Sequence, residues 1–290
     1  MERRVTLPPF DLHRTRSVEE AGELLTRYGD DAAVLCGGTE ILLLLKLGFA
    51  AYGHLVDVKA IDGLGGIHAE DGTLVIGSTV THREVELAPI VLDRLPALAA
   101  MVRRVANVRV RNVGTLGGNL CFSDPHSDPA TFLLALDAEV EYRSAGEATR
   151  ASLSEFLVGP YETALEHGQL LTAIRIPLPT EGTTIVHRKL AFHERPAATV
   201  TCLVRVADGV VAEVRIGVGS VGARPVRAAE AERALTGTGA DDPDTLASAA
   251  ELAAEASHPA EDANGSVAYK EQIVRVLVER CFRSAVRDCA

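Results

Sequence analysis

Two short glycine-rich segments constrain the fold and chemistry of this chain more than any other feature. The first is Val34-Leu35-Cys36-Gly37-Gly38-Thr39-Glu40-Ile41, and the second is Arg111-Asn112-Val113-Gly114-Thr115-Leu116-Gly117-Gly118-Asn119. Each places adjacent glycines beside a hydroxyl residue. Glycine has no Cβ, so its backbone adopts positive φ angles and approaches a ligand closely. Successive backbone amides in such turns form concave sites for anions.

Either loop taken alone is also explained as a tight turn, because adjacent glycines are common in turns. Neither has the GxGxxG spacing of dinucleotide-binding folds or the GxxxxGK(S/T) spacing of phosphate loops, for which Lys46 is misplaced. The usual NAD and ATP fingerprints are therefore excluded. Two loops together suit a diphosphate bridge better than a single phosphate, with Thr39, Thr115 and Asn119 available for further hydrogen bonds.

The charge and composition of the chain exclude several other functions. Lys and Arg number 29 against 40 Asp and Glu, a net charge of −11, and there is no Trp. This balance disfavours a nucleic-acid-binding surface, which needs clustered basic residues and often aromatic side chains. No apolar run approaches the roughly 18 residues that span a bilayer. No apolar segment follows Met1-Glu2-Arg3-Arg4, so no secretory signal is expected.

The cysteines are informative because of what they lack. The five residues, Cys36, Cys121, Cys202, Cys281 and Cys289, include no Cys-x-x-Cys pair. The chain is therefore expected to hold no iron–sulfur or structural zinc site, and its dispersed thiols fit a reducing cytoplasm. The acidic turn at 124–128 is better explained by turn chemistry than by metal binding. Redox chemistry in this chain requires an organic cofactor.

Hydrophobic patterning predicts a small α/β unit near the N-terminus and a mixed middle third. Ser17 with Glu20, and Thr81 with Glu84, form capping boxes that predict helices to about Tyr28 and across 83–88. The apolar runs 32–36 and 55–58 are typical of buried strands. Further predicted elements are strands at 74–77, 139–142 and 170–176, helices at 95–105 and 129–136, and a glycine-rich loop at 113–119.

The last third of the chain has a different pattern of predicted elements. Strands are predicted at 187–192, 199–206 and 210–218, and Asp208-Gly209 between the last two is a strong hairpin turn. Helical spacing follows at 228–235, at 244–256 and from 267 to 285. This pattern predicts an antiparallel sheet followed by helices.

At the level of motifs, the chain resembles the flavoprotein subunits of the molybdenum hydroxylases, the family of carbon monoxide dehydrogenase and xanthine dehydrogenase. The first glycine loop resembles their N-terminal FAD loop. The second, from Val110 to Asn119 and on through Ser123 to Pro129, resembles their second FAD loop. The resemblance spans nearly the full chain. Further matches are Ile174-Arg175-Ile176-Pro177, Lys189, Pro225, Arg227, Glu230, Glu232, Leu235, Gly237, Tyr269-Lys270, Leu277 and Arg280.

The resemblance implies an α+β fold with three parts. A two-subdomain FAD-binding fold of the vanillyl-alcohol-oxidase (PCMH) type is expected first, followed by a C-terminal three-stranded antiparallel sheet with helices. The expected parts are an N-terminal α/β FAD subdomain (residues 1–58), a central mixed α+β FAD subdomain (59–179) and a C-terminal domain like that of the carbon monoxide dehydrogenase flavoprotein (180–290). FAD would lie between the first two.

The resemblance also implies which residues hold FAD. Asp128, Leu171 and Lys189 match flavin contacts of the family, and Val105 matches a position near the isoalloxazine. Backbone contacts at the diphosphate are implied for Val34, Leu35, Cys36, Gly37, Gly38, Thr39, Glu40, Ile41, Thr115, Gly117, Gly118 and Asn119. No residue is expected to act as a catalytic acid or base, because the cofactor carries the chemistry.

From the residues alone, other interpretations of these positions stay open. The Asp128 carboxylate could accept a hydrogen bond from a ribose or ribityl hydroxyl, or it could cap the following helix. Lys189 is equally explained as a solvated strand lysine. Cys36 could tether a flavin covalently, although packing of a buried thiol is the simpler explanation.

One stretch departs from the family pattern. Many relatives have paired Arg, then Asp, a large apolar or aromatic residue and Ala, where this chain has Phe192-His193-Glu194-Arg195-Pro196-Ala197-Ala198-Thr199. Ala198 is therefore expected to replace the large side chain that covers one flavin face. Either Phe192 or His193 takes over that role, or the face is more open. The departure bears on the electron acceptor.

By resemblance, the chain is expected to be the FAD-binding electron-transfer subunit of a molybdopterin-dependent hydroxylase. A large molybdopterin subunit and a small subunit with two [2Fe-2S] clusters would be its partners, as a dimer of heterotrimers. Electrons would leave FAD for NAD⁺, a quinone or oxygen. Two alternatives stay open: a stand-alone FAD-dependent oxidase or reductase with its own substrate pocket, and a binding or assembly protein that has lost the flavin.

Overall fold

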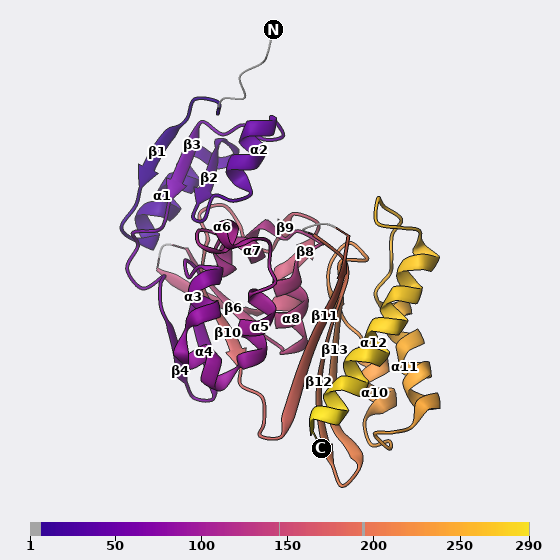
Figure 1. Ribbon diagram of the computed structural model, residues 1–290. Helices are drawn as coiled ribbons and strands as arrows, with labels where there is room; N and C mark the ends of the chain where they lie inside the picture. Colours follow the sequence, from indigo (N-terminus) through magenta and orange to yellow (C-terminus); the bar gives the residue numbers. More distant parts are fainter. Residues whose placement is uncertain (1–6, 145, 193–194, 290) are drawn as a thin grey trace.

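The computed structural model describes residues 7–144, 146–192 and 195–289. The Met1–Arg4 segment and His193, which entered the sequence predictions, lie outside the described residues. Within that part, three larger sheets follow one another along the chain, and a two-stranded sheet is inserted between two strands of the second. Figure 1 shows the N-terminal unit at one end and the C-terminal helices at the other. No helix in the described ranges is long and apolar enough to cross a membrane.

The N-terminal sheet is parallel, with strand order β1-β3-β2. Ser17 accepts a hydrogen bond from the backbone of Glu20 at the start of the first helix, as predicted, but the Glu20 carboxylate accepts from Arg16 instead of closing the capping box. The elements are β1 (Asp11–Arg14), α1 (Val18–Tyr28), a 3₁₀ turn (Gly29–Asp31), β2 (Ala32–Leu35), α2 (Ile41–Leu47) and β3 (His54–Asp57).

A strand does form within residues 32–36, as predicted, but the prediction that this strand is buried is wrong. Strand β2 pairs on one side only, with β3, and Val34 remains 37% exposed. The central strand β3 is the buried one, with Leu55 and Val56 fully enclosed. An apolar run alone does not distinguish an edge strand from a central one.

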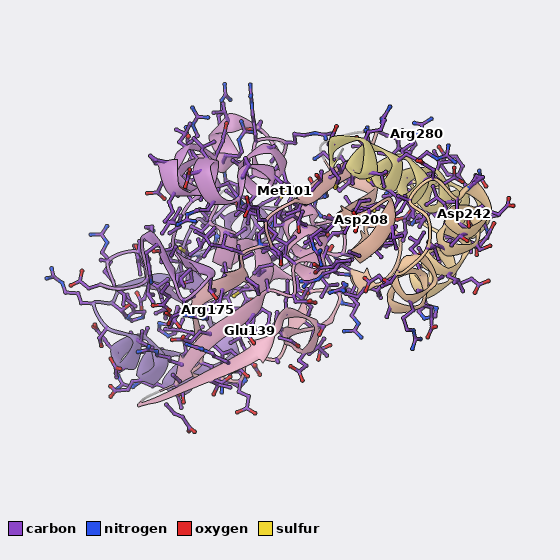
Figure 2. All side chains as sticks on the ribbon, turned by 90° about the horizontal axis from the view of Figure 1, so that it is seen from below. Met101, Glu139, Arg175, Asp208, Asp242 and Arg280 are labelled. Carbon is purple, nitrogen blue, oxygen red and sulfur yellow. The ribbon has the colours of Figure 1, made fainter. Side chains whose placement is uncertain are left out.

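The central sheet is antiparallel, with strand order β4-β5-β10-β6-β7. Arg175 and Glu139 lie opposite each other on β10 and β6 (Figure 2). The strands are β4 (Ile67–Glu70), β5 (Thr73–Gly77), β6 (Glu139–Ser144), β7 (Glu147–Ser152) and β10 (Leu170–Pro177), and the small extra sheet is β8 (Leu157–Gly159) with β9 (Glu162–Thr163).

Short helices surround the central sheet, and several of them contribute to a core that includes Phe132 and Phe156. The predicted Thr81–Glu84 capping box is complete, and the helix predicted at 95–105 ends earlier, at Val102. The helices are α3 (His82–Leu87), α4 (Pro89–Arg94), α5 (Pro96–Val102), α6 (Val108–Arg111), α7 (Leu116–Phe122), α8 (Asp128–Ala135) and α9 (Leu153–Phe156).

The second glycine segment is not the loop predicted at 113–119. Helix α7 begins at Leu116 and runs through Gly117 and Gly118, because the Thr115 hydroxyl accepts a hydrogen bond from the backbone N–H of Gly118. A threonine cap stabilises a helix by about 1 kcal/mol. That is comparable to the cost of one helical glycine, and packing supplies the rest.

The C-terminal sheet confirms the three predicted strands and adds a short fourth, β14. Asp208 and Gly209 both have positive φ in the hairpin turn, as a two-residue type I′ turn requires. Helices α10 to α12 cover one face of the sheet, and α8 of the central part packs against the other (Figure 1). The elements are β11 (Thr183–Ala191), β12 (Pro196–Ala207), β13 (Val210–Gly219), β14 (Val226–Arg227), α10 (Ala229–Leu235), α11 (Pro243–Ala256) and α12 (Val267–Cys289).

Candidate functional site

The two glycine loops, far apart in sequence, lie against each other. A Cβ added to Gly37 would lie 2.5 Å from the carbonyl oxygen of Val113 and 3.1 Å from the amide nitrogen of Thr115. A Cβ on Gly114 would lie 3.4 Å from the hydroxyl of Thr39. Only glycine allows the two backbones this approach. The fold therefore brings together the two segments that the sequence singled out.

The first loop turns the chain from β2 into α2. Gly38 has a φ of +71°, a conformation that glycine adopts without strain. The backbone N–H groups of Gly38, Thr39 and Glu40 donate to no acceptor in the described part of the chain. Three consecutive amides are thus available to an anionic ligand at the point where the loops meet.

The second loop is held by the segment that connects β5 to α3. The carbonyl of Gly114 accepts from the backbone of His82, and the amide of Leu116 donates to Val80. A Cβ on Gly117 would lie 2.5 Å from the carbonyl oxygen of Ser78, so this glycine packs inward. Gly118, its neighbour, is exposed. The second loop therefore presents one glycine to the interior and one to the surface.

Two of the side chains predicted to bind the ligand are already engaged as hydrogen-bond acceptors within the protein. The Thr115 hydroxyl caps α7, and the side-chain oxygen of Asn119 accepts from the Ser127 hydroxyl at 2.7 Å. The Asn119 contact ties the second loop to the start of α8. Thr115 and Asn119 thus shape the loop, and the Asn119 amide group keeps its own N–H donors for other partners.

Asp128 and Lys189 form a buried ion pair with each other. The ammonium of Lys189 donates to Asp128 at 2.5 Å and to the carbonyl of Arg104 at 2.7 Å, and His187 lies 3.4 Å from the same carboxylate. Burial would raise the pKa of Asp128, but His187 and Lys189 outweigh it and lower that pKa. The solvated-lysine interpretation of Lys189 is therefore wrong. The capping interpretation of Asp128 is also wrong, because Ser127 holds the N-cap position.

Leu171 and Val105 are core residues close to the loop supports. Leu171 lies at a β-bulge in β10, and the next residue, Thr172, accepts a hydrogen bond from Ser78, on which Gly117 packs. The carbonyl of Val105 accepts from the guanidinium of Arg111. Both side chains belong to the central hydrophobic core.

His82 is a buried residue of this region that the sequence did not reveal. It is 3% exposed, lies beside Gly114, and its Nδ1 has no hydrogen-bond partner. Burial, together with the charge of Arg111, lowers the pKa of His82 to about 4. The capping box located this residue at a helix start, but nothing local indicated its burial.

Arg195 was also missed. It lies at the start of β12 and contacts carboxylates from both loop regions: Glu40 at 3.2 Å and Asp124 at 2.5 Å. Burial raises the pKa of Glu40, and the nearby Arg195 opposes that rise. This cluster joins three segments that are far apart in sequence, which is why no local motif predicted it.

The expectation for Ala198 is wrong. Its side chain packs in the C-terminal core with Val200 and Cys202, on the face of β12 that α12 covers. The opposite face carries Thr199 and Thr201, which contact Thr131 of α8 and His187. Because side chains alternate along a strand, Ala198 points away from the glycine loops. Phe192 is about half exposed.

The surroundings of the Cys36 thiol favour packing over covalent attachment of a flavin. Burial is the largest influence on it and raises its pKa, with the Thr115 side chain opposing the rise. A protonated thiol is a poor nucleophile. Cys121 is affected in the same way, because burial raises its pKa to about 12. Packing of the thiol is the explanation that stands.

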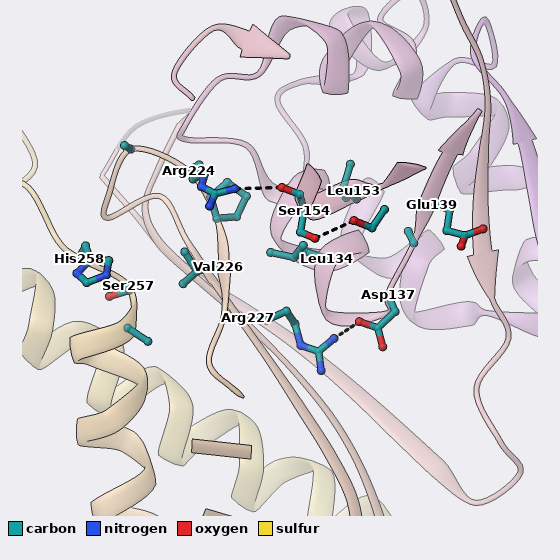
Figure 3. A pocket seen from close by; sticks show the side chains of 15 residues that line it. Leu134, Asp137, Glu139, Leu153, Ser154, Arg224, Val226, Arg227, Ser257 and His258 are labelled. Atoms are coloured by element: carbon teal, nitrogen blue, oxygen red, sulfur yellow. Dashed lines mark hydrogen bonds and ion pairs between the residues drawn. The ribbon is translucent and has the colours of Figure 1, made fainter. Parts of the chain in front are cut away.

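A separate cavity of about 650 Å³ lies between the central part and the C-terminal part (Figure 3). The guanidinium of Arg224 donates to the carbonyl of Ser154 at one side, and Arg227 pairs with Asp137 at the other. None of the predicted flavin residues lines it. The cavity therefore does not supply a substrate pocket beside the loops, as a stand-alone oxidase would need.

Comparison with known protein families identifies the family to which this chain belongs. Residues 8–179 match the FAD binding domain in molybdopterin dehydrogenase, and residues 189–285 match the CO dehydrogenase flavoprotein C-terminal domain. The chain belongs to the FAD-binding medium subunits of the molybdenum hydroxylases. It is thus an oxidoreductase subunit with an FAD-binding domain.

Individual relatives agree with this family. The chain is 33% identical to the carbon monoxide dehydrogenase medium chain of Hydrogenophaga pseudoflava, covering 98% of this chain and 99% of the relative. It is 34% identical to the xanthine dehydrogenase FAD-binding subunit of Escherichia coli O157:H7 over 76% and 77% of the two chains. The predicted family and cofactor are therefore confirmed.

Solved structures of the family have the same fold. A carbon monoxide dehydrogenase structure from Hydrogenophaga pseudoflava matches with a TM-score of 0.95 at 33% identity, covering 98% of this chain and 100% of that one. Quinoline 2-oxidoreductase from Pseudomonas putida 86 matches with a TM-score of 0.92 at 28% identity, over 98% and 99%. The predicted α+β fold class is confirmed.

Proposed function

We propose that the two glycine loops hold the diphosphate of FAD between them. The observation that carries this proposal is the backbone contact between Gly37 and the second loop, with free amides on Gly38, Thr39 and Glu40 beside it. The proposed contact residues are Val34, Leu35, Cys36, Gly37, Gly38, Thr39, Glu40, Ile41, Val105, Thr115, Gly117, Gly118, Asn119, Asp128, Leu171 and Lys189.

These residues have different tasks. Amides of the first loop donate to the diphosphate, and the exposed Gly118 lets the cofactor approach the second loop without a side chain in the way. Gly37 and Gly117 keep the loops packed on each other and on the sheet. FAD, when bound, supplies reversible uptake of electrons.

Asp128 and Lys189 contribute through their buried pair. With both carboxylate oxygens engaged by Lys189 and His187, Asp128 is suited to hold Lys189 in place as much as to accept from a cofactor hydroxyl. The pair keeps a positively charged ammonium beside Arg104, next to Val105.

The complex around the chain is also part of the proposal. A large subunit with molybdopterin oxidises the substrate, and a small subunit passes electrons through two [2Fe-2S] clusters to FAD. NAD⁺, a quinone or oxygen then takes them up. The support is that the relatives are medium chains of carbon monoxide dehydrogenase and FAD-binding subunits of xanthine dehydrogenase. We further propose a dimer of heterotrimers in the cytoplasm, and a chain divided at 58 and 179.

The test is the cofactor content of the native complex. The chain is tagged in its own host, purified with whatever it binds, and its flavin is released and identified. Stoichiometric FAD together with a molybdopterin subunit and an iron–sulfur subunit supports the proposal. A complex that contains no flavin and takes up no added FAD contradicts it. FAD on a lone chain that oxidises an organic substrate would favour the stand-alone oxidase instead.

A further inference from the structure

We infer that Arg195 is a positioning residue for the FAD loops, which neutralises two carboxylates so that an anionic diphosphate can bind beside them. The inference rests on the proposed FAD site. Arg195 contacts neither glycine pair. From its place at the start of β12, it would nevertheless raise the affinity of the loops for FAD.

The contacts of Arg195 span three segments of the chain. One guanidinium nitrogen lies 3.2 Å from a carboxylate oxygen of Glu40, which follows directly on the first glycine loop. The other lies 2.5 Å from Asp124, between the second glycine loop and α8. Arg195 itself comes from the C-terminal part. A single side chain thus connects that part to both loop regions.

The charges of this cluster do not balance without Arg195. Glu40 and Asp124 bring two negative charges toward a site that must accept a third anionic group, and like charges at short distance repel. The other cation at the first loop, Lys59, is paired with Asp57 at 3.0 Å. Lys59 therefore does not replace Arg195 as the partner of these carboxylates.

The Asp124 carboxylate is held by a backbone contact, and the backbone of Glu40 is fixed at the start of α2, so neither residue leaves the loop regions. Asp124 is 8% exposed and also accepts from the backbone of His126. Glu40 is the N-cap residue of α2 and belongs to the loop itself. Removing the guanidinium leaves both carboxylates without their cationic partner in the two loop regions, where each unpaired charge weakens the binding of an anion.

The experiment measures FAD affinity of the full chain by equilibrium titration at low salt. Arg195→Met is expected to weaken FAD binding about tenfold, a moderate effect because the guanidinium is half exposed and partly screened. Arg195→Lys, which keeps the charge, is expected to retain most of the affinity. Adding Glu40→Gln to Arg195→Met is expected to restore much of the loss, because it removes one unpaired carboxylate.

The matched control is Arg227→Met. Arg227 also bridges the C-terminal part and the central part, through Asp137 at the far end of α8, but it touches neither loop. Arg227→Met is expected to leave FAD affinity unchanged even if it lowers the stability of the apoprotein. Thermal unfolding of every apoprotein separates loss of affinity from loss of fold.

The outcomes distinguish this inference from the proposed function. If the wild-type chain and its complex bind no FAD, the proposed function fails. If wild type binds FAD and Arg195→Met binds it equally well, only the inference is overturned. It is also overturned if Arg195→Met weakens binding but Glu40→Gln restores none of it, because Arg195 would then be a tether and not a neutralising charge.

Discussion

The two glycines within each loop differ in what surrounds them. Gly37 and Gly117 face inward. A Cβ added to either one would lie 2.5 Å from a backbone carbonyl oxygen. Gly38 and Gly118 face other side chains or solvent. A Cβ on Gly38 would lie 3.1 Å from a leucine methyl, and a Cβ on Gly118 would meet the hydroxyl of Thr115, which caps α7. The inner glycine of each pair is required by the fold. The outer glycine is required instead by the backbone conformation or by the close approach of the ligand.

This difference separates two roles that the sequence motif merges. A glycine pair looks uniform in the sequence, yet one member packs against backbone, Gly37 on the second loop and Gly117 on Ser78, while the other leaves space for a ligand. Mutations at the inner positions should disturb the protein itself. Mutations at the outer positions should disturb the cofactor more than the protein.

The largest effect is expected at the inner glycines. In Gly37→Ala or Gly117→Ala, the new methyl group would clash with neighbouring backbone atoms that cannot move aside. Overpacking of this kind lowers the free energy of unfolding by about 3 kcal/mol. Denaturant unfolding of the apoprotein measures the loss of stability. An unchanged unfolding midpoint in both variants would show that Gly37 does not contact the second loop and that Gly117 does not contact Ser78.

A smaller loss of stability, with complete loss of FAD, is expected at the outer glycines. Gly38→Val forces a branched side chain into a φ of +71°, which costs about 2 kcal/mol, and Gly118→Val blocks the approach of the cofactor. Gly48→Val is the control, since Gly48 has a φ of +75° at the end of α2 with open space around it. Normal FAD content in Gly38→Val and Gly118→Val would refute their assignment.

His82 should make the stability of the loop junction depend on pH. Its folded pKa of about 4 lies below the unfolded value of about 6.5. As pH falls below 6.5, the unfolded chain binds a proton that the folded one does not, so the free energy of unfolding decreases by up to about 1.4 kcal/mol per pH unit. The decrease ends near pH 4, where the folded protein also binds the proton.

The measurement is denaturant unfolding of the apoprotein across this pH range, for wild type and for His82→Gln. Glutamine keeps a polar side chain but does not titrate, so the variant is expected to lose this part of the slope. Identical slopes for both proteins would mean that His82 is not held neutral at the inner side of the second loop.

The smallest effect is expected at Cys36, which precedes the first glycine pair. Cys36→Ala should lower stability by no more than about 1 kcal/mol, since it removes one partly buried sulfur, and it should leave FAD content unchanged. Flavin that is released by acid from both wild type and variant would agree with this expectation. Flavin that remains attached to denatured wild type and is lost in the variant would show a covalent link.

Local signals in the sequence were sufficient for much of the fold. Thr81 with Glu84, Ser17, and Asp208-Gly209 act over three or four residues, and the structure has a helix start or hairpin turn at each. Both glycine segments were also recognisable, because their spacing resembles a family motif. What the sequence did not show was that the second segment begins a helix, since the Thr115 cap competes with the preference of two glycines for a loop.

The rest depended on contacts between distant segments. No local pattern indicates that Val34 lies on an edge strand, that Lys189 finds Asp128, or that Arg195 reaches Glu40. Ala198 was misplaced because alignment with a motif does not tell which face of a strand a residue occupies. Burial and pairing of charges are properties of the folded chain.

The central claim is that the two loops bind the diphosphate, and one measurement tests it most directly. The affinity of the purified apoprotein is compared for FAD and for riboflavin, which has the same ring system but no phosphate. FAD is expected to bind at one site per chain and much more tightly than riboflavin. Equal affinities for the two compounds would contradict the claim, because the loops would then contribute nothing to binding.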